Sequence, residues 1–139
     1  MSWLVDTDVL SNRTKPKPNP GVIEWLRENA ADFYTCSHVI AEVATGIERL
    51  TEGRRKTELQ EWLHHLLRPL RGRILNFNDT VAIVWARQEA EYERLGCPMP
   101  MPDSFIAATA RRHNLTIITR NESDYQRPGL GVLNPFTRA

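Results

Sequence analysis

The stretch Leu115-Thr116-Ile117-Ile118-Thr119 decides the class of fold. A short apolar run of this kind, followed by polar residues, is typical of a strand buried in a parallel sheet. Weaker runs of the same kind occupy residues 3–5, 33–36, 74–77 and 130–133, and we expect the last to be an edge strand. Helical patterns separate these runs along the chain. The sequence therefore predicts an α/β fold, in which helices cover both faces of a central, mostly parallel sheet.

The helices between these strands are indicated by apolar residues at helical spacing and by capping residues. A proline-rich loop over residues 14–20 precedes the first long helix, and Gly96 should end the helix that follows the third strand. The predicted helix starts are an Asn19 cap before Pro20, a Ser37 cap, Arg54, an Asn78 or Asp79 cap, and Asp103.

Length and composition favour one ordinary globular domain over residues 1–139. Hydrophobic residues make up 41% of the chain and charged residues 25%, which is close to the average for folded proteins. The net charge of +1 excludes a strongly basic nucleic-acid coat but allows local basic patches. Two cysteines, Cys36 and Cys97, form neither a disulfide framework nor a metal motif. With no signal peptide and no membrane segment in the sequence, we expect a cytoplasmic protein.

Four acidic residues lie next to segments that are predicted to be buried: Asp6, Glu42, Asp103 and Asp124. Asp6 ends the first strand, and Asp124 follows the clearest strand by five residues. Glu42 lies in the second turn of the helix after the second strand, and Asp103 begins a helix on its inward face. Ligands of such sheets bind outside the carboxyl ends of the strands, so all four carboxylates are expected to converge at one edge. Asp8 is placed to approach the same edge.

Clustered carboxylates suit Mg²⁺ or Mn²⁺, which prefer oxygen ligands and can activate water for the hydrolysis of phosphate esters. Taken singly, each residue has an ordinary explanation. Asp6 and Asp103 are also typical of helix caps and first turns, Asp124 of a turn, and Glu42 of a solvated helix flank. The set of four favours the metal site more strongly than any one member does.

Four segments, in this order, resemble the motifs of PIN-domain ribonucleases of the VapC/FitB-like toxin branch. They are Leu4-Val5-Asp6-Thr7-Asp8-Val9-Leu10, residues 37–46 around Ala41-Glu42, residues 102–110 around Asp103, and Thr119-Arg120-Asn121-Glu122-Ser123-Asp124-Tyr125. The similarity covers essentially the whole chain and implies a PIN-like three-layer α/β/α sandwich. Two positions depart from the usual pattern: Asp8 replaces a commoner asparagine, and Ser104 replaces a small apolar residue.

The resemblance implies a Mg²⁺- or Mn²⁺-dependent endoribonuclease toxin of a type II toxin–antitoxin pair. It implies Asp6, Glu42, Asp103 and Asp124 as the catalytic and metal-binding residues. Thr119, Asn121 and Asp8 are expected to support them. It also implies a homodimer and a small antitoxin protein that inserts a segment into the cleft.

Basic residues near the predicted cleft are expected to contact the phosphates of RNA. They are Arg13, Lys15 and Lys17 on the loop after the first strand, and Arg120 within the fourth motif. No histidine is needed as a general base, and His38 is expected to make a local polar contact.

Three other readings remain open at the level of sequence. A DNA-directed or structure-specific nuclease would use the same carboxylates. A non-catalytic module that binds nucleic acid or a protein partner would keep the fold, although clustered carboxylates do not help it to bind polyanions. A thiol enzyme using Cys36 or Cys97 has no support from the spacing of the two cysteines.

Overall fold

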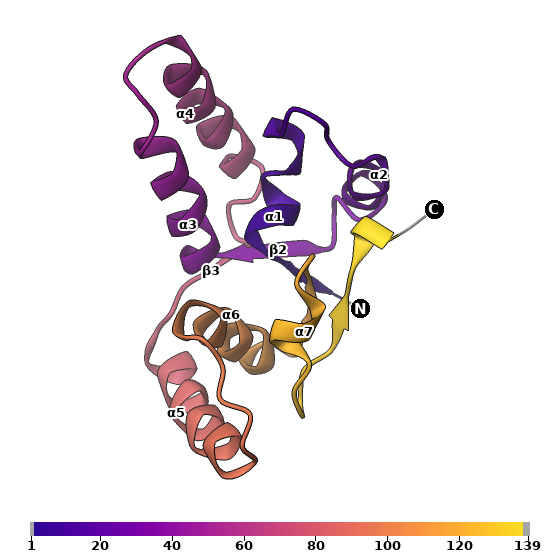
Figure 1. Ribbon diagram of the computed structural model, residues 1–139, viewed down its shortest axis with the longest axis vertical. Coiled ribbons are helices and arrows are strands. Elements are labelled where there is room, and N and C mark those ends of the chain that lie inside the picture. The colour runs from indigo at the N-terminus through magenta and orange to yellow at the C-terminus, as the bar shows by residue number, and fades with distance from the viewer. Residues whose placement is uncertain (1, 138–139) are drawn as a thin grey trace.

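The computed structural model describes residues 2–137 and contains a five-stranded parallel sheet (Figure 1). Its strand order is β3-β2-β1-β4-β5, with β1 and β4 side by side. The strands are β1 (Trp3–Val5), β2 (Phe33–Cys36), β3 (Ile74–Leu75), β4 (Thr116–Ile118) and β5 (Val132–Leu133). The prediction of a parallel sheet from the alternation of strands and helices is confirmed, and β5 is an edge strand as expected.

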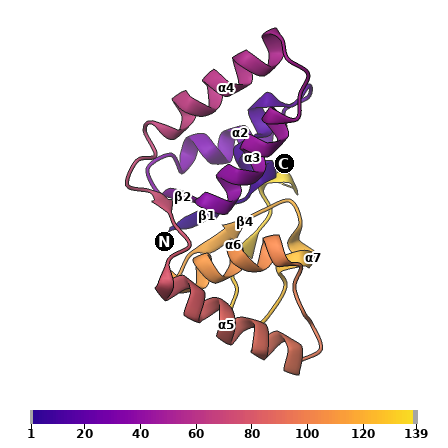
Figure 2. The same ribbon diagram turned by 90° about the vertical axis from the view of Figure 1, so that its left-hand side faces the viewer.

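Helices cover the sheet on both faces, as Figure 2 shows. On one face lie α2 (Pro20–Glu28), α3 (Ser37–Glu48) and α4 (Arg54–Leu67), and on the other lie α5 (Asp79–Arg94) and α6 (Met101–Arg112). Short helical segments complete the chain: α1 (Thr7–Leu10), η1 (Asn12–Thr14), α7 (Glu122–Tyr125) and η2 (Pro135–Thr137). This arrangement confirms the predicted three-layer sandwich.

The two central strands form the middle of the core. Leu4, Val5, Ile117 and Ile118 have no exposed surface, because helices pack against both faces of these strands. At about 25 cal/mol per Å² of apolar surface removed from water, each such side chain contributes roughly 1.5–3 kcal/mol to folding. This buried centre fixes the positions of the residues that follow β1 and β4.

Two predicted helix starts were wrong by a small margin. Ser37 is the first residue of α3 rather than its cap, because β2 runs directly into the helix and Cys36 takes the cap position. The helix α6 begins at Met101, two residues before Asp103. Pro102 does not prevent this, because the first turn of a helix does not need the N–H group that proline lacks. Asp103 therefore lies inside the first turn.

The predicted caps of two other helices agree with the structure, whereas β3 and β5 are each two residues shorter than predicted. The Asn19 and Asn78 side chains accept hydrogen bonds from Val22 N and Val81 N, and so cap α2 and α5. Gly96 follows α5 with a φ of 72°, a conformation that favours glycine. Cys36 and Cys97 are free. No helix within residues 2–137 has the length and apolar character needed to cross a membrane.

Candidate active site

Asp6 and Thr119 are brought together by the pairing of the two central strands. Val5 lies opposite Ile118 in the parallel register, so the next residue of each strand leaves the sheet at the same edge. The Thr119 hydroxyl donates to Asp6 Oδ2 at 2.9 Å, and this hydroxyl is buried. The other carboxylate oxygen, Asp6 Oδ1, accepts from Thr7 N at 2.7 Å and caps α1. Asp6 is thus both a helix cap and a fixed, 6% exposed carboxylate at the carboxyl edge of the sheet.

Glu42 reaches the same edge from α3. Its Oε2 accepts a hydrogen bond of 2.7 Å from the hydroxyl of Thr7, the residue after Asp6. The helix begins directly after β2, which pairs with β1. Thr7 therefore links Asp6 to Glu42, with its backbone N–H bound to one carboxylate and its hydroxyl to the other.

Asp103 approaches from the opposite layer, because α6 precedes β4 and so begins at the carboxyl edge of the sheet. The hydroxyl of Tyr125 lies between Asp103 and Asp6, 3.3 Å from Asp103 Oδ1 and 3.4 Å from Asp6 Oδ2. Tyr125 itself is fully buried and ends α7, the short helix that also carries Asp124. The fourth sequence motif therefore supplies a hydroxyl as well as a carboxylate.

The pKa values show that these carboxylates act on one another. Burial raises the pKa of Asp103 to about 6, with further increases from the charges of Asp6, Asp124 and Glu42. Burial also raises the pKa of Asp6, where Glu42 and Asp8 add to the increase while the Thr7 and Thr119 hydrogen bonds oppose it. Such coupling requires that the charges lie near each other. Hydrogen bonds through Thr7 and Tyr125 thus connect Asp6, Glu42 and Asp103, while Asp124 and Asp8 lie close enough to act on this group through their charge.

No lysine or arginine of residues 2–137 pairs with this charge. Among residues 2–137, none of the four carboxylates forms an ion pair with lysine or arginine. The hydrogen-bond donors that the side chains of Thr7, Thr119 and Tyr125 direct at them are all neutral hydroxyls. The cluster therefore keeps its negative charge and presents only hard oxygen atoms.

Those oxygens suit Mg²⁺ or Mn²⁺ by their chemistry. No three acidic, histidine or cysteine side chains in the described part of the chain are arranged to hold an ion by themselves. Mg²⁺ usually keeps several water ligands and binds to proteins through only one or two carboxylates. The donor set thus fits an ion that is held partly by water.

Comparison with known proteins places the chain in a family. The PIN domain pattern matches residues 3–129. Toxin FitB of Neisseria gonorrhoeae is 35% identical over 135 residues, which cover 96% of this chain and 97% of FitB.

The chain belongs to the PIN-domain family, in its FitB/VapC group.

One further relative and one solved structure match this PIN domain over nearly its whole length. A VapC ribonuclease of Sinorhizobium fredii is 30% identical over 138 residues, which cover 98% of this chain and 99% of the relative. The crystal structure of FitAcB from Neisseria gonorrhoeae contains a chain that superimposes with a TM-score of 0.92 at 33% identity, with 98% of this chain and 99% of that chain covered. The fold and the family named from the sequence motifs are confirmed.

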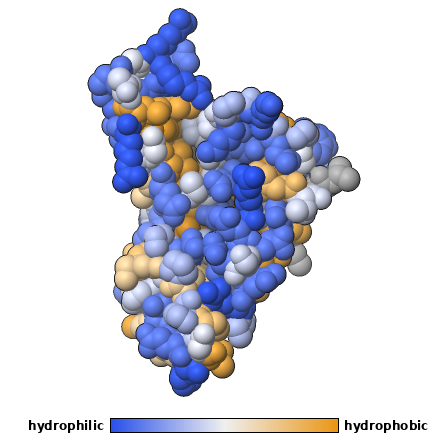
Figure 3. Space-filling view, viewed as in Figure 1, coloured by the Kyte–Doolittle hydropathy of each residue, from blue (hydrophilic) through white to orange (hydrophobic). Residues whose placement is uncertain are grey.

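An apolar groove runs from Glu42 along one side of the site, between α3 and α4 (Figure 3). It has a volume of about 310 Å³. Its apolar lining is Val43, Ile47, Leu50, Leu59 and Trp62, and Lys15 and Arg55 also line it. Apolar grooves of this kind on a protein surface are typical of binding sites for other proteins.

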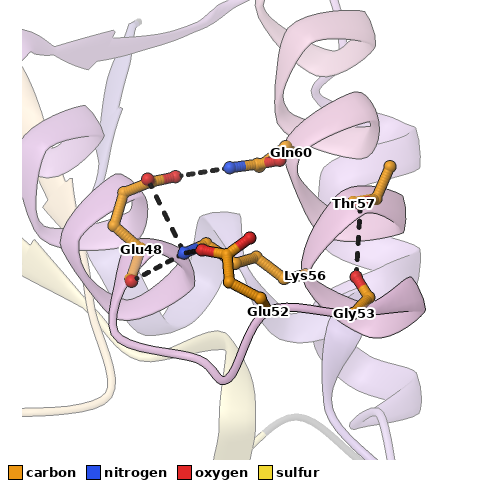
Figure 4. Close-up of polar contacts among 6 residues, drawn as sticks. All are labelled: Glu48, Glu52, Gly53, Lys56, Thr57 and Gln60. Atoms are coloured by element: carbon orange, nitrogen blue, oxygen red, sulfur yellow. Dashed lines mark hydrogen bonds and ion pairs between the residues drawn. The ribbon is translucent and has the colours of Figure 1, made fainter.

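A buried lysine fixes the hairpin that forms the two walls of this groove (Figure 4). The ammonium of Lys56 in α4 donates to Glu52 Oε1 at 2.6 Å and to the Glu48 carbonyl oxygen at 3.1 Å. Gln60 of α4 donates to Glu48 Oε2 at 2.7 Å. These contacts join the end of α3 to the first turns of α4, so they hold the two walls of the groove in place.

A second hollow lies beside Asp8 and contains most of the basic residues that were predicted to contact RNA. Asp8, Lys15, Lys17 and Arg120 all line it, whereas Arg13 is exposed and does not. Asn121 meets the site through its backbone N–H, which donates to Thr119 Oγ1 at 3.0 Å, and its side chain is exposed. Arg13 and the Asn121 side chain are therefore more peripheral than the sequence motifs indicated.

A third hollow, on the other side of Glu42, is lined by an aromatic cluster. His38 stacks on Phe105 with ring centroids 4.5 Å apart, and Phe105 stacks in turn on Trp85. The expected local polar contact of His38 is wrong, because its buried Nδ1 has no hydrogen-bond partner. Ser104 accepts from the Trp85 indole at 2.9 Å and donates to the Met101 carbonyl oxygen, which accounts for a hydroxyl at a position that is usually apolar.

Sequence reasoning missed two residues of the PIN site, Thr7 and Tyr125. Both stand inside motifs that were identified, directly after a predicted carboxylate, but neither carries a charge that would have marked it. Cys36 is also unsuited to thiol chemistry, since burial raises its pKa to about 11 and so disfavours the reactive thiolate.

Proposed function

We propose that this PIN domain is a Mg²⁺- or Mn²⁺-dependent endoribonuclease, and the toxin of a type II toxin–antitoxin pair in the cytoplasm. The observation that carries the proposal is the convergence of Asp6, Glu42, Asp103 and Asp124 at one edge of the sheet, where no lysine or arginine of residues 2–137 forms an ion pair with them. The names of two relatives, a FitB toxin and a VapC ribonuclease, support the choice of RNA and the role as a toxin.

The four carboxylates would hold the metal ion, which when bound supplies a polarised phosphoryl oxygen and a water of lowered pKa. Asp6 is kept in one orientation by Thr119 and the Thr7 backbone, so its oxygens need no rearrangement on binding. Thr7 orients Glu42 in the same way. Asp103 carries a proton more readily than an ordinary aspartate and must lose it to act as a ligand.

The antitoxin partner is proposed to occupy the apolar groove between α3 and α4. Its apolar lining suits a hydrophobic segment of another protein, and the groove begins at Glu42, so a segment lying in it would end beside the carboxylates. The solved structures of FitAB and FitAcB support a protein partner.

The homodimer is proposed to form over the hollow beside the aromatic cluster. Met101 is 60% exposed there, next to Phe105 and Pro102, and a large apolar side chain with that exposure favours association. Light scattering should give twice the chain mass of 16.0 kDa. A strict monomer at all concentrations would contradict this assignment.

Parallel digestion of single-stranded RNA and single-stranded DNA of the same sequence tests the nuclease activity. The wild type is expected to cut RNA with Mg²⁺ or Mn²⁺ and to lose this activity with a chelator. Asp6→Asn should abolish cleavage while keeping the fold, because asparagine retains the oxygen that caps α1.

Asp32→Asn serves as the matched control, because Asp32 is exposed and precedes β2 at the opposite edge of the sheet. Full metal-dependent activity of the Asp6→Asn protein would refute the proposed role of Asp6. Cleavage of DNA in preference to RNA would refute the choice of substrate.

A further inference from the structure

The hollow beside Asp8 differs from the apolar groove and from the hollow beside the aromatic cluster in the charge and the rigidity of its lining. It has a volume of about 670 Å³, within the range of sites that hold small ligands. Three cations line it, Lys15, Lys17 and Arg120, and none of them forms an ion pair within residues 2–137. Cations that the protein leaves unpaired in a hollow are free to pair with an external anion.

The loop that carries the two lysines is restrained by hydrogen bonds and by prolines. Asn12 is 3% exposed, and its side chain accepts from Asn19 N at 3.1 Å and donates to Asn19 O at 3.3 Å. Three prolines within residues 16–20 restrict φ along the loop. Arg55 of α4 donates to the Thr14 carbonyl oxygen at 2.9 Å. The loop is therefore preorganised, which lowers the entropy cost of binding a ligand there.

Another part of the lining is formed by Arg120 and Phe136, with the guanidinium of Arg120 over the Phe136 ring. The guanidinium carbon of Arg120 lies 5.1 Å from the centroid of the Phe136 ring. Asn19 also donates to the Phe136 carbonyl oxygen at 3.4 Å, so one residue braces both parts of the lining. Bases of single-stranded nucleic acids stack on aromatic rings and on arginine planes of this kind.

The hollow adjoins the carboxylate centre through two chain neighbours. Arg120 follows Thr119, which binds Asp6, and Asp8 is near enough to Asp6 to raise its pKa. The negative charge of Asp8 disfavours a phosphate next to it, whereas Lys15 and Lys17 attract a phosphate to their own part of the lining. A bound nucleotide is thereby oriented along the hollow.

From this arrangement we infer that the hollow is a nucleotide subsite for the RNA strand, next to the phosphodiester that is cleaved. Lys15, Lys17 and Arg120 contact the backbone phosphates, and one base stacks on the plane formed by Arg120 and Phe136. The inference rests on the proposed ribonuclease function and adds to it the position of one flanking nucleotide.

The test measures the binding of a short, fluorescein-labelled single-stranded RNA to the purified full chain, by anisotropy in a chelator so that cleavage does not occur. Lys17→Gln/Arg120→Gln is expected to raise Kd by about tenfold and to reduce the slope of log K against log salt by about 1.4, or 0.7 for each lost phosphate contact. The matched control, Arg87→Gln/Arg94→Gln, removes two cations from α5 that line a different hollow and should change Kd by less than about twofold.

Phe136→Leu separates stacking from charge. It is expected to raise Kd by about threefold to tenfold without changing the salt slope, because it removes the ring beneath Arg120 but no cation. Circular dichroism verifies that the variant is folded. RNA binding equal to that of the wild type would contradict the proposal that a base stacks on Arg120 and Phe136.

An equal change in the Kd for RNA in the two double variants would overturn the proposed subsite. In that case, cleavage of RNA by the wild type with Mn²⁺ would still uphold the ribonuclease. A wild-type protein that neither binds nor cleaves RNA would overturn both proposals.

Discussion

Removing the charge of Asp103 should stabilise the metal-free protein. Asp103 lies in a field of Asp6, Asp124 and Glu42, is half-buried, and has no cationic partner among the described residues. The Asp103→Asn substitution keeps the shape of the side chain and an oxygen that can accept from the Tyr125 hydroxyl. It therefore removes the cost of burying a charge and the repulsion from the neighbouring carboxylates, and it leaves the local packing intact.

The expected gain follows from the pKa of the carboxyl group. A pKa of about 6, against an ordinary 3.8, corresponds to roughly 3 kcal/mol between the charged and neutral forms. Because Asp103 is only half-buried, solvent screening reduces the usable part to about 1 kcal/mol. Between pH about 4 and about 6 the unfolded chain has released this proton while the folded protein retains it, so the wild type loses stability across that range and regains none above it. The D103N variant lacks this loss.

Urea unfolding monitored by tryptophan fluorescence in a chelator measures the difference. The D103N variant should match the wild type near pH 4 and exceed it by about 1 kcal/mol near pH 7.5. Saturating Mn²⁺ should reverse the order, because binding to the folded state stabilises the wild type by about 2.7 kcal/mol at a hundred times Kd and the variant by less. D32N should show neither effect. A D103N protein that is less stable than the wild type by the same amount at every pH would refute the electrostatic argument.

The hydroxyls of Tyr125 and Thr119 and the ammonium of Lys56 give three further tests. Tyr125→Phe should raise the pKa of Asp103 further, because the Tyr125 hydrogen bond lowers it, and a shift of the pH–cleavage profile to higher pH would show this. Thr119→Val should cost about 1–2 kcal/mol in urea unfolding and reduce cleavage, since it removes the buried 2.9 Å bond to Asp6, and Thr119→Ser should restore both. Lys56→Met should weaken binding of the purified antitoxin about tenfold in titration calorimetry, at unchanged RNA cleavage, because it loosens only the hairpin around the groove.

The acidic residues could be located from sequence because their positions follow from general rules of parallel sheets. Asp6 and Thr119 each come directly after a buried strand, and the two strands proved to be neighbours in the sheet. Glu42 could be placed from the position of the second strand alone, because the helix that carries it begins directly after that strand. The start of α6 was less certain, because Pro102 is compatible with both a loop and a first helical turn.

The residues that organise the site could not be found in the same way. Thr7 contributes through a backbone N–H and a hydroxyl that point to different carboxylates, a geometry set by the turn into α1. Tyr125 reads in sequence as an ordinary core aromatic, and only the fold of α7 places its hydroxyl between Asp6 and Asp103. The role of a neutral side chain depends on its orientation, which the residue type does not encode.

The choice of hydroxyls as partners bears directly on how the site works. A lysine or arginine beside Asp6 would neutralise it, lower the pKa values of its neighbours, and compete with a metal ion for the same oxygens. The hydroxyls of Thr7, Thr119 and Tyr125 instead fix the carboxylates and leave their charge in place. In the metal-free protein these carboxylates repel one another, and the metal ion proposed above would compensate that charge.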